Sequence, residues 1–396
     1  MKKVLVTGSN GFIGKNLVQS LSRLKNIKLL TFDVENDPED LIQLAGESDF
    51  IYHLAGVNRP EYNEQFMQGN FTLTDMLITG LLKKKKTPAV ILSSSIQAAL
   101  DNPYGISKSR AEDSIARYSA QSGAASYIFR LPNVFGKWCR PNYNSVVATF
   151  CHNISHGLDI TVSDPEKELA LVYIDDVIKA FIEILSLESK ELVDNMENRQ
   201  VIKEDESMMV LAKGGFYGIR RVFTTTLGGL ADKIYQLRDI RKTLVLPDLS
   251  DEFMRCLHST YISYLDKNDL SYAADMKTDA RGSLFELIRS EQMGQIFISR
   301  SFENITRGNH YHDSKVEKFC LIQGEAEIRL RSILSDEVIT YHVSGSKVKI
   351  VDIPPGYTHS IENTGDGEMI VIFWSSRLFD QNNPDTYYEN VLRGEV

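Results

Sequence analysis

Three side chains in the N-terminal half have the types and spacing of a proton-transfer site. The segment LSSSIQA places Ser93, Ser94 and Ser95 after an apolar run, and YGISK follows with Tyr104 and Lys108. Residues four apart lie on one face of a helix, so a phenol and an ammonium can act together there. The phenol has an ordinary pKa of about 10, and a nearby cation favours its ionised form. Ser95 can then hydrogen-bond a carbonyl that is being reduced, while Tyr104 protonates the emerging alkoxide.

Glycines near the start of the chain provide a second chemical feature. In VLVTGSNGFIG, Gly8, Gly11 and Gly14 lie between an expected strand at 3–7 and an expected helix at 14–23. Such a turn lets the backbone approach a pyrophosphate, whose charge the helix N-terminus favours; a plain tight turn is the alternative. Asp33 ends the next strand, where a carboxylate can bind the adenosine ribose and favours NAD over NADP, unless it is a loop aspartate without a ligand. The residues expected to contact NAD(P)H are Gly8, Gly11, Phe12, Ile13, Gly14, Asp33, Leu54, Ala55 and Lys108.

Histidines near the C-terminus form a third feature. GNHYHDSKVEKFCLIQG contains His310, His312 and Glu317, and PPGYTHSIEN contains His359. Alternate residues of an extended strand point to the same face, so His310 and His312 can reach one ion. With Glu317 and His359 they form a set of three nitrogens and one oxygen that suits zinc, or iron, manganese or nickel. The sequence predicts a divalent metal site, with zinc favoured, and a metal-free use of the same residues is the alternative.

The pattern of apolar residues predicts two kinds of architecture. Strands expected at 3–7, 27–33, 50–55, 89–93 and 126–131 alternate with amphipathic helices, which predicts a doubly wound parallel sheet of the Rossmann type. After about Ser271, short alternating strands separated by Gly, Asp, Asn and Pro predict a small antiparallel barrel or sandwich. We therefore expect a reductase domain at 1–265 and a metal-binding domain at 266–396, with a polar, variable connection at 185–216.

Composition narrows the class of protein. The chain has 396 residues and a formal net charge of −9, which argues against a nucleic-acid partner. No apolar run approaches the roughly 20 residues of a membrane helix, and the glycine-broken N-terminus does not suit a signal peptide. Four widely spaced cysteines form no CxxC pair. We expect a cytoplasmic protein with no membrane insertion.

From residue 1 to about 185 the chain resembles the extended short-chain dehydrogenase/reductase family, most of whose members act on nucleotide-activated sugars. The matching segments are TGSNGFIG, HLAG, Asn70, SSS, YxxxK, RLPNVFG and VYIDDV. The resemblance implies that Ser95, Tyr104 and Lys108 are catalytic and that Asn133 lies near the sugar nucleotide. Dehydratases of the family carry an acidic pair where this chain has Ile96–Gln97, which argues against a dehydratase.

The histidine segments resemble both signature motifs of the cupin superfamily, which implies a jelly-roll barrel. DARGSLFE and RGNHY also resemble signatures of deoxysugar 3,5-epimerases, which are themselves cupins. In those enzymes the residue that matches His310 is the base that removes a proton beside a 4-keto group. His310 is therefore either this base or a metal ligand, and Arg281 or Arg307 is expected to hold substrate phosphate.

The whole chain resembles a family of bifunctional enzymes of capsular polysaccharide synthesis. The resemblance implies epimerisation at C3 of UDP-2-acetamido-2,6-dideoxy-4-hexulose in the cupin domain, and then reduction of the C4 ketone with NADPH, on the route to UDP-N-acetyl-L-fucosamine. Because Asp33 favours NADH, we expect NAD(P)H without choosing between the two. The alternatives are a single-activity UDP-sugar 4-epimerase or reductase with a structural cupin module, and a redox-sensing regulator, against which the intact Ser95–Tyr104–Lys108 set argues. A homodimer is expected because it is the commonest oligomer.

Overall fold

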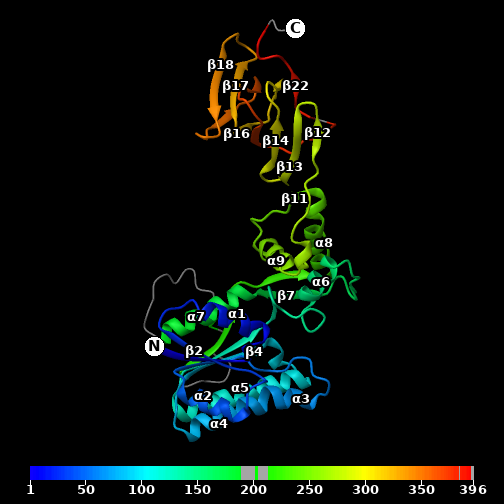
Figure 1. Ribbon diagram of the computed structural model, residues 1–396. Coiled ribbons are helices and arrows are strands. Elements are labelled where there is room, and N and C mark those ends of the chain that lie inside the picture. Colours follow the sequence, from blue (N-terminus) through cyan, green and yellow to red (C-terminus); the bar gives the residue numbers. More distant parts are fainter. Residues whose placement is uncertain (189–200, 204–212, 383, 394–396) are drawn as a thin grey trace. The chain divides into compact units, whose positions relative to one another are not determined.

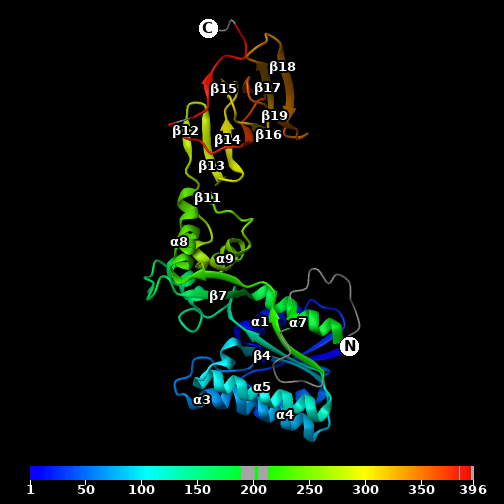
Figure 2. The same ribbon diagram turned by 180° about the vertical axis from the view of Figure 1, so that it is seen from behind.

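The computed structural model describes residues 1–188, 201–203, 213–382 and 384–393. The chain divides into two compact units (Figures 1 and 2). The N-terminal unit comprises Met1–Ile234 and Cys256–Leu265, and the C-terminal unit comprises Tyr235–Arg255 and Asp266–Val396. The predicted division into functional domains at 265/266 stays a prediction. The variable connection expected at 185–216 falls mainly outside the described residues.

The N-terminal unit is an α/β structure. It contains β1 (Lys2–Thr7), α1 (Phe12–Leu21), β2 (Ile27–Phe32), α2 (Pro38–Glu47), β3 (Phe50–His53), α3 (Glu64–Phe66), the π-helical η1 (Met67–Thr72), α4 (Leu73–Lys83), β4 (Ala89–Ser95), the 3-10 helix η2 (Ile96–Ala99), α5 (Pro103–Ser122), β5 (Ser126–Leu131), β6 (Asn133–Phe135), α6 (Val146–Ser155), β7 (Glu168–Tyr173), α7 (Ile174–Glu188), β8 (Val201–Lys203), β9 (Gly214–Ile219) and β10 (Phe223–Thr226).

The main sheet has the order β2-β1-β3-β4-β5-β9-β8 and is parallel from β2 to β9, with β8 antiparallel at its edge. Helices α1 and α7 cover one face, and α2, α4 and α5 cover the other (Figure 1). Strands β3 and β4 are buried along their whole length, as expected for central strands covered on both faces. The predicted doubly wound sheet is confirmed, and β6, β7 and β10 form a separate three-stranded sheet.

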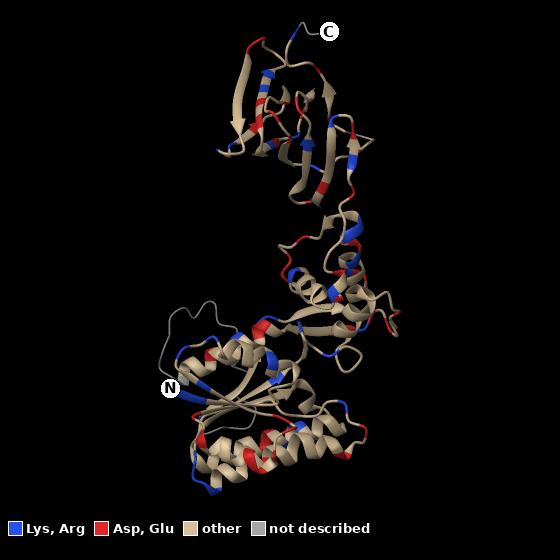
Figure 3. Cartoon of the chain, viewed as in Figure 1, with Lys and Arg blue, Asp and Glu red and all other residues tan. Residues whose placement is uncertain are grey.

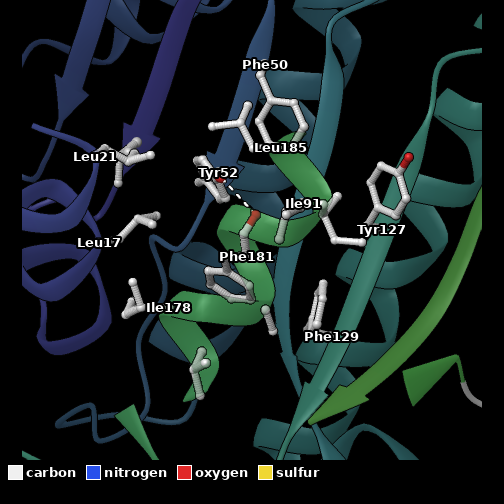
Figure 4. Packing of buried hydrophobic residues seen from close by; sticks show 14 of the residues in the cluster. Leu17, Leu21, Phe50, Tyr52, Ile91, Tyr127, Phe129, Ile178, Phe181 and Leu185 are labelled. Atoms are coloured by element: carbon white, nitrogen blue, oxygen red, sulfur yellow. Dashed lines mark hydrogen bonds between the residues drawn. The ribbon is translucent and has the colours of Figure 1, made fainter. Parts of the chain in front are cut away.

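Aromatic packing fills the layer between the sheet and α7 (Figure 4). The ring of Phe181 lies 5.0 Å from that of Phe129 and 5.8 Å from that of Tyr52. The Tyr52 hydroxyl donates a 3.0 Å hydrogen bond to the main-chain oxygen of Phe181, so burial of this phenol leaves no unpaired donor. This core fixes the sheet whose strand ends carry the site.

The C-terminal unit is rich in β-structure. Helices α8 (Leu227–Thr243) and α9 (Glu252–Ile262) contribute residues to both units. The unit also contains β11 (Val245–Leu246), the 3-10 helix η4 (Lys267–Asp269), β12 (Lys277–Asp279), β13 (Gly282–Ser290), β14 (Gly294–Ser301), β15 (Thr306–Tyr311), β16 (Glu317–Gln323), β17 (Glu325–Ser332), β18 (Val338–Ser344), β19 (Ile350–Ile353), β20 (Tyr357–Asn363), β21 (Met369–Ser375) and β22 (Tyr387–Tyr388).

Two sheets share one apolar core in this unit. One has the order β11-β13-β14-β21-β16-β19, with β12 paired to β13, and the other has the order β18-β17-β20-β15-β22. Alternate side chains of β16, β17, β20 and β21 meet between the sheets, with Leu321, Ile328 and Val371 fully buried. The prediction of an α/β domain followed by an all-β domain is confirmed.

Charged residues of both signs are distributed along both units (Figure 3). Within the described ranges, no helix combines the length and apolarity needed to cross a membrane.

Candidate active site and metal centre

A cleft of about 500 Å³ opens in the N-terminal unit at the carboxyl ends of the parallel strands. Its walls come from the glycine turn after β1, the end of β4, the start of α5, and β6 with the loop that follows it. Among the predicted residues, those that line this cleft are Gly8, Gly11, Phe12, Ile13, Gly14, Leu54, Ser95, Tyr104, Lys108 and Asn133. Of the expected cofactor and catalytic residues of this unit, Asp33 and Ala55 are not among those that line the cleft.

The glycine turn is packed too tightly for side chains. Gly8 has a φ of +67°, and a Cβ there would lie 2.7 Å from the backbone nitrogen of Ala55. A Cβ on Gly14 would lie 2.0 Å from the carbonyl oxygen of Gly8. The turn therefore holds the start of α1 directly against β1, as a pyrophosphate-binding turn requires.

Asp33 lies beside the glycine turn, directly after β2. One carboxylate oxygen accepts a 2.6 Å hydrogen bond from the backbone nitrogen of Asn10, and the other accepts one of 2.8 Å from Val34. The structure thus places a negative charge next to the turn, at the position where a dinucleotide-binding domain holds its adenosine ribose.

The start of α5 positions the two predicted proton-transfer residues. Asn102 accepts a 2.8 Å hydrogen bond from the backbone nitrogen of Gly105 and caps the helix, and Pro103 occupies its first turn. The phenol of Tyr104 and the hydroxyl of Ser95 both line the cleft. The Lys108 ammonium donates a 2.8 Å hydrogen bond to the main-chain oxygen of Ser93. Serine, tyrosine and lysine therefore converge as predicted.

The expected effect of the lysine on the phenol differs from what the structure shows. Burial raises the pKa of Tyr104, and the nearby Ser95 hydroxyl opposes this only in part. Burial also lowers the pKa of Lys108 to about 8, although the nearby Glu112 carboxylate acts in the opposite direction. Desolvation, which the sequence spacing does not reveal, therefore has the largest effect on the pKa of both groups. Tyr104 is therefore held in its protonated form, which suits a proton donor.

Buried polar groups support this cleft from behind. Glu112 accepts a hydrogen bond from the Ser94 hydroxyl at 2.5 Å and pairs with Arg130 through both carboxylate oxygens. This network ties α5 to β4 and β5 and so fixes the helix that carries Tyr104 and Lys108.

His53 is buried behind the cleft and hydrogen-bonded through both ring nitrogens. Its Nδ1 lies 2.8 Å from the hydroxyl of Thr7, and its Nε2 lies 2.9 Å from that of Thr74. The Thr74 hydroxyl donates to the carbonyl of Asn70 and the Thr7 hydroxyl accepts from Ala55, so Nε2 carries the proton. Burial lowers the pKa of His53 to about 3, and the Lys108 charge adds to the effect.

The loop after β6 adds cleft residues that the sequence analysis missed. Trp138, Arg140 and Tyr143 line the cleft, and Trp138 holds a positive φ of 70° with half of its surface exposed. The Arg140 guanidinium lies 5.1 Å from the Tyr143 ring centre. The signal was available, because GKWCRPNYNS, rich in aromatic and basic residues, directly follows the RLPNVFG motif.

The four predicted metal ligands of the C-terminal unit converge. His310, His312, Glu317 and His359 each offer an atom within 4.8 Å of the others. Glu317 Oε2 lies 3.3 Å from His312 Nε2 and 3.4 Å from His359 Nε2. Ligand atoms around a tetrahedral zinc ion are about 3.4 Å apart, because each bond is about 2.1 Å long. The distances from Glu317 to His312 and to His359 already match this spacing.

The hydrogen bonds of the imidazoles test whether these residues fit a cation. His312 Nδ1 donates a 2.6 Å hydrogen bond to the carbonyl of Asp385, and His359 Nδ1 donates one of 3.2 Å to the carbonyl of Tyr357. Each neutral imidazole then carries its lone pair on Nε2, and neither Nε2 has a hydrogen-bond partner among the described residues. Two lone pairs and a carboxylate thus face one another, and the residues fit a bound cation.

His310 is the fourth member of the cluster, and its ring lies beside those of His312 and His359. Its ring centre lies 4.5 Å from that of His359 and 5.0 Å from that of His312. Burial, together with His359 and His312, lowers the pKa of His310 to about 4, so the imidazole is neutral at pH 7.

A β-bulge in β15 decides which residues share the face of His310. Along the pair β15–β20, Arg307 lies opposite Ile361 and His310 lies opposite His359, with a register shift between Gly308 and His310. Ile361 and His359 are two apart on β20, so they share one face. The extra residue of the bulge therefore turns Arg307 to the same face as His310, although strict alternation over three residues would separate them.

The two predicted phosphate-binding arginines have different surroundings. Arg307 is half-buried, and its Nε donates a 2.8 Å hydrogen bond to the Ser301 hydroxyl. Arg281 is exposed and pairs with Asp279 at 2.5 Å. Arg307 thus has the better position to act beside the histidine cluster.

Comparisons with known proteins bear on both units. Residues 4–193 match the NAD dependent epimerase/dehydratase family, and residues 277–387 match the polysaccharide biosynthesis C-terminal domain. The UDP-2-acetamido-2,6-beta-L-arabino-hexul-4-ose reductase of Pseudomonas aeruginosa is 39% identical over 392 residues, which cover 99% of this chain and 100% of that protein. A crystal structure of the capsular polysaccharide assembling protein CapF from Staphylococcus aureus has a TM-score of 0.86 and 41% identity, and covers 98% of this chain and 100% of that one. The chain belongs to the CapF family.

The family resemblance expected from the sequence is thereby confirmed over the full length. More distant structures show the fold alone. The UDP-glucose 4-epimerase of Thermotoga maritima, at 18% identity, covers 66% of this chain and 98% of its own length with a TM-score of 0.51. The CapF-family similarity, in contrast, includes the segments that carry the histidine cluster.

Proposed function

We propose that this CapF-family chain is a bifunctional enzyme acting on a UDP-activated 4-keto-6-deoxy-N-acetylhexosamine. Its C-terminal unit, a cupin, epimerises C3 of UDP-2-acetamido-2,6-dideoxy-4-hexulose, and its N-terminal unit reduces the C4 ketone, in capsular precursor synthesis leading to UDP-N-acetyl-L-fucosamine. The observation that carries the proposal is that one chain holds both the Ser95–Tyr104–Lys108 cleft and the buried histidine–glutamate cluster. The name of the Pseudomonas relative supports a UDP-activated 4-keto sugar as the substrate class.

The reduction uses the serine, tyrosine and lysine side chains of the cleft. NAD(P)H, when bound, supplies the hydride. Ser95 donates a hydrogen bond to the C4 carbonyl and orients it, and Tyr104 delivers its proton to the developing alkoxide. The raised pKa of Tyr104 keeps this proton in place until it is needed. Lys108, with its pKa lowered to about 8, can then return a proton to the phenolate.

The cleft residues fit a dinucleotide. The glycine turn would let its main chain approach a pyrophosphate, and Asp33 beside the turn would accept a hydrogen bond from a ribose hydroxyl. The same carboxylate repels the 2′-phosphate of NADPH. We therefore propose that NADH is used more readily than NADPH.

The histidine cluster fits a divalent metal, with zinc favoured. His312, Glu317 and His359 would hold it, because Glu317 Oε2 lies at the spacing of tetrahedral zinc ligands from both Nε2 atoms. A metal bound there would stabilise the negative charge of an enolate. His310 then remains as the base toward C3, and a fourth-ligand role for His310 is the alternative.

The epimerisation follows from the acidity of a hydrogen beside a ketone. His310 removes the C3 proton, and the electron pair moves into an enolate with its charge on O4. Protonation of C3 from the opposite face restores the ketone with inverted configuration. Arg307 lies on the face of His310 and can hold the substrate diphosphate there. Reduction at C4 afterwards removes the ketone and makes the new configuration permanent.

An experiment in deuterated buffer tests both steps. The chain is incubated with the UDP-4-keto sugar, and NMR follows deuterium at C3 while absorbance at 340 nm follows NAD(P)H oxidation. We expect His359→Ala to stop C3 exchange, and Tyr104→Phe to stop cofactor oxidation while exchange continues. His310→Asn should lose exchange but keep zinc, whereas loss of zinc would assign His310 as a ligand.

The alternative is a single-activity reductase or 4-epimerase whose C-terminal unit is structural. Under this alternative, His359→Ala would give the same product, with the same deuterium content, as the unmodified chain. The intact proton-transfer group argues against a non-enzymatic regulator. The homodimer and the cytoplasmic location stay predictions from the sequence.

A further inference from the structure

The C-terminal segment Pro384–Val391 lies against the strand that carries the histidine cluster. Its β22 pairs with the end of β15, with Tyr388 opposite His310 and Tyr387 opposite Tyr311. The chain here is therefore a neighbour of the proposed metal ligands, although Asp385 follows His312 by 73 residues. We refer to Pro384–Val391 as the C-terminal strap.

One residue of the strap contacts a proposed ligand directly. The main-chain oxygen of Asp385 accepts a 2.6 Å hydrogen bond from His312 Nδ1. A carbonyl can only accept, so this bond fixes the proton on Nδ1 and leaves the Nε2 lone pair directed at Glu317. The Thr386 hydroxyl lies 3.4 Å from the same nitrogen.

The side chain of Asp385 holds that carbonyl in place. Its carboxylate accepts hydrogen bonds from the backbone nitrogens of Asp313, Ser314 and Lys315, at 2.9, 3.2 and 3.0 Å. These are the three residues directly after His312. Asp385 also has a positive φ of 44°, a conformation that non-glycine residues keep only when their contacts enforce it.

The far end of the strap is fixed by a fully buried arginine. Arg331, which is 1% exposed, donates 2.9 Å hydrogen bonds to the main-chain oxygens of Val391 and Asn390 and pairs with Glu389 at 2.6 Å. Asn309, the bulged residue of β15, accepts from the backbone nitrogens of Glu389 and Val391. The strap is thus held at both ends around the ligand strand.

We propose that the C-terminal strap sets the metal affinity of the histidine cluster, with Asp385 as the positioning residue that holds His312. This inference rests on the metal site of the proposed function. Partners of metal-bound histidines typically change affinity by about 10–100-fold when they are lost. Because Asp385 acts through a neighbouring imidazole, the effect should appear in metal binding itself, without substrate.

The test measures zinc dissociation constants of the full chain by competition with a chromophoric chelator. We expect Asp385→Ala to raise the zinc Kd by about 10–100-fold, and Asp385→Asn, which keeps one acceptor oxygen, to raise it less. The matched control is Asp380→Ala, because Asp380 is an exposed neighbour whose carboxylate accepts a hydrogen bond from the backbone nitrogen of Asn382. The control should bind zinc like the unmodified chain. Cobalt loading adds a second measurement, since the absorption spectrum of bound Co²⁺ changes when a ligand rotates.

Different results separate the two proposals. If the unmodified chain and His359→Ala bind zinc equally weakly, the metal site itself is wrong. If His359→Ala loses zinc while both Asp385 variants keep the Kd and the cobalt spectrum of the unmodified chain, the role of the strap is wrong. Circular dichroism and thermal unfolding of the zinc-free proteins establish that each variant folds, and Asp385→Asn decides the matter if Asp385→Ala does not.

Discussion

The buried ammonium of Lys108 donates a 2.8 Å hydrogen bond to the main-chain oxygen of Ser93. This bond joins α5 to the end of β4, and it holds the cation in the same cleft as Ser95 and Tyr104. The lysine therefore fixes the helix, and in the proposed function it also supplies a proton. If Tyr104 and Lys108 relay a proton, the rate of C4 reduction depends on pH and on the chemistry of these two side chains.

Removal of the Tyr104 hydroxyl should affect only the reduction. We expect Tyr104→Phe to slow C4 reduction by about 10²–10⁴-fold, the usual contribution of a general acid. The C3 exchange should continue at the rate of the unmodified chain, because the histidine cluster is assembled from other elements. Stopped-flow measurement of NAD(P)H oxidation, with NMR of C3 on the same samples, checks both rates. Equal loss of both activities would contradict separate sites.

The pH dependence of the reduction should report Lys108. Because burial lowers the pKa of Lys108 to about 8, the rate of reduction should fall above about pH 8 as the ammonium loses its proton. Lys108→Arg keeps its charge, so its alkaline limb should move to higher pH. Lys137→Arg is the control, since Lys137 is partly exposed and pairs with Asp175. A profile that stays unchanged in Lys108→Arg would exclude the lysine as the titrating group.

Cofactor preference should depend on Asp33. Asp33→Asn removes the charge that opposes a 2′-phosphate but keeps an acceptor for Asn10, so we expect the ratio of kcat/KM for NADPH to that for NADH to rise about tenfold, or roughly 1.4 kcal/mol. Glu39→Gln, an exposed change in α2, serves as the control. Steady-state kinetics with both cofactors measure the ratio. No change in the ratio would show that the ribose does not reach Asp33.

Acid should destabilise the N-terminal unit through His53. The pKa of about 3 in the folded chain lies below the ordinary histidine value of about 6.5, so the neutral imidazole contributes stability at neutral pH that is lost as the pH falls below 6.5. At pH 5 the loss should be about 2 kcal/mol, because each pH unit corresponds to about 1.4 kcal/mol. Urea unfolding at pH 7 and pH 5 should show a smaller acid effect in His53→Gln than in the exposed-site control His156→Gln. If both variants lose the same stability between pH 7 and pH 5, His53 is not the group responsible.

Local chemistry was predictable from sequence, whereas long-range geometry was not. The glycine turn, the Tyr104–Lys108 spacing and the HxH motif each lie within a few residues, so strand and helix periodicity is enough to place them. The bulge at Gly308–His310 changes the face of Arg307, and alternation alone gives the wrong face. The contact between Asp385 and His312 joins residues 73 apart, and no local pattern predicts it. The raised pKa of Tyr104 follows from burial, which appears only when the layers are assembled.

The π-helical turn η1 carries the side chain that connects the cleft to α5. Asn70 accepts from the backbone nitrogen of Val57 at 2.9 Å and donates to the Ser107 hydroxyl at 3.0 Å. A π-turn contains one residue more than the α-helix it interrupts, and each residue rotates a helix by roughly 100°. Loss of a single codon within 67–72 would restore a regular helix but swing this amide away from both partners. CapF-family chains should therefore tolerate substitutions in this turn far better than insertions or deletions.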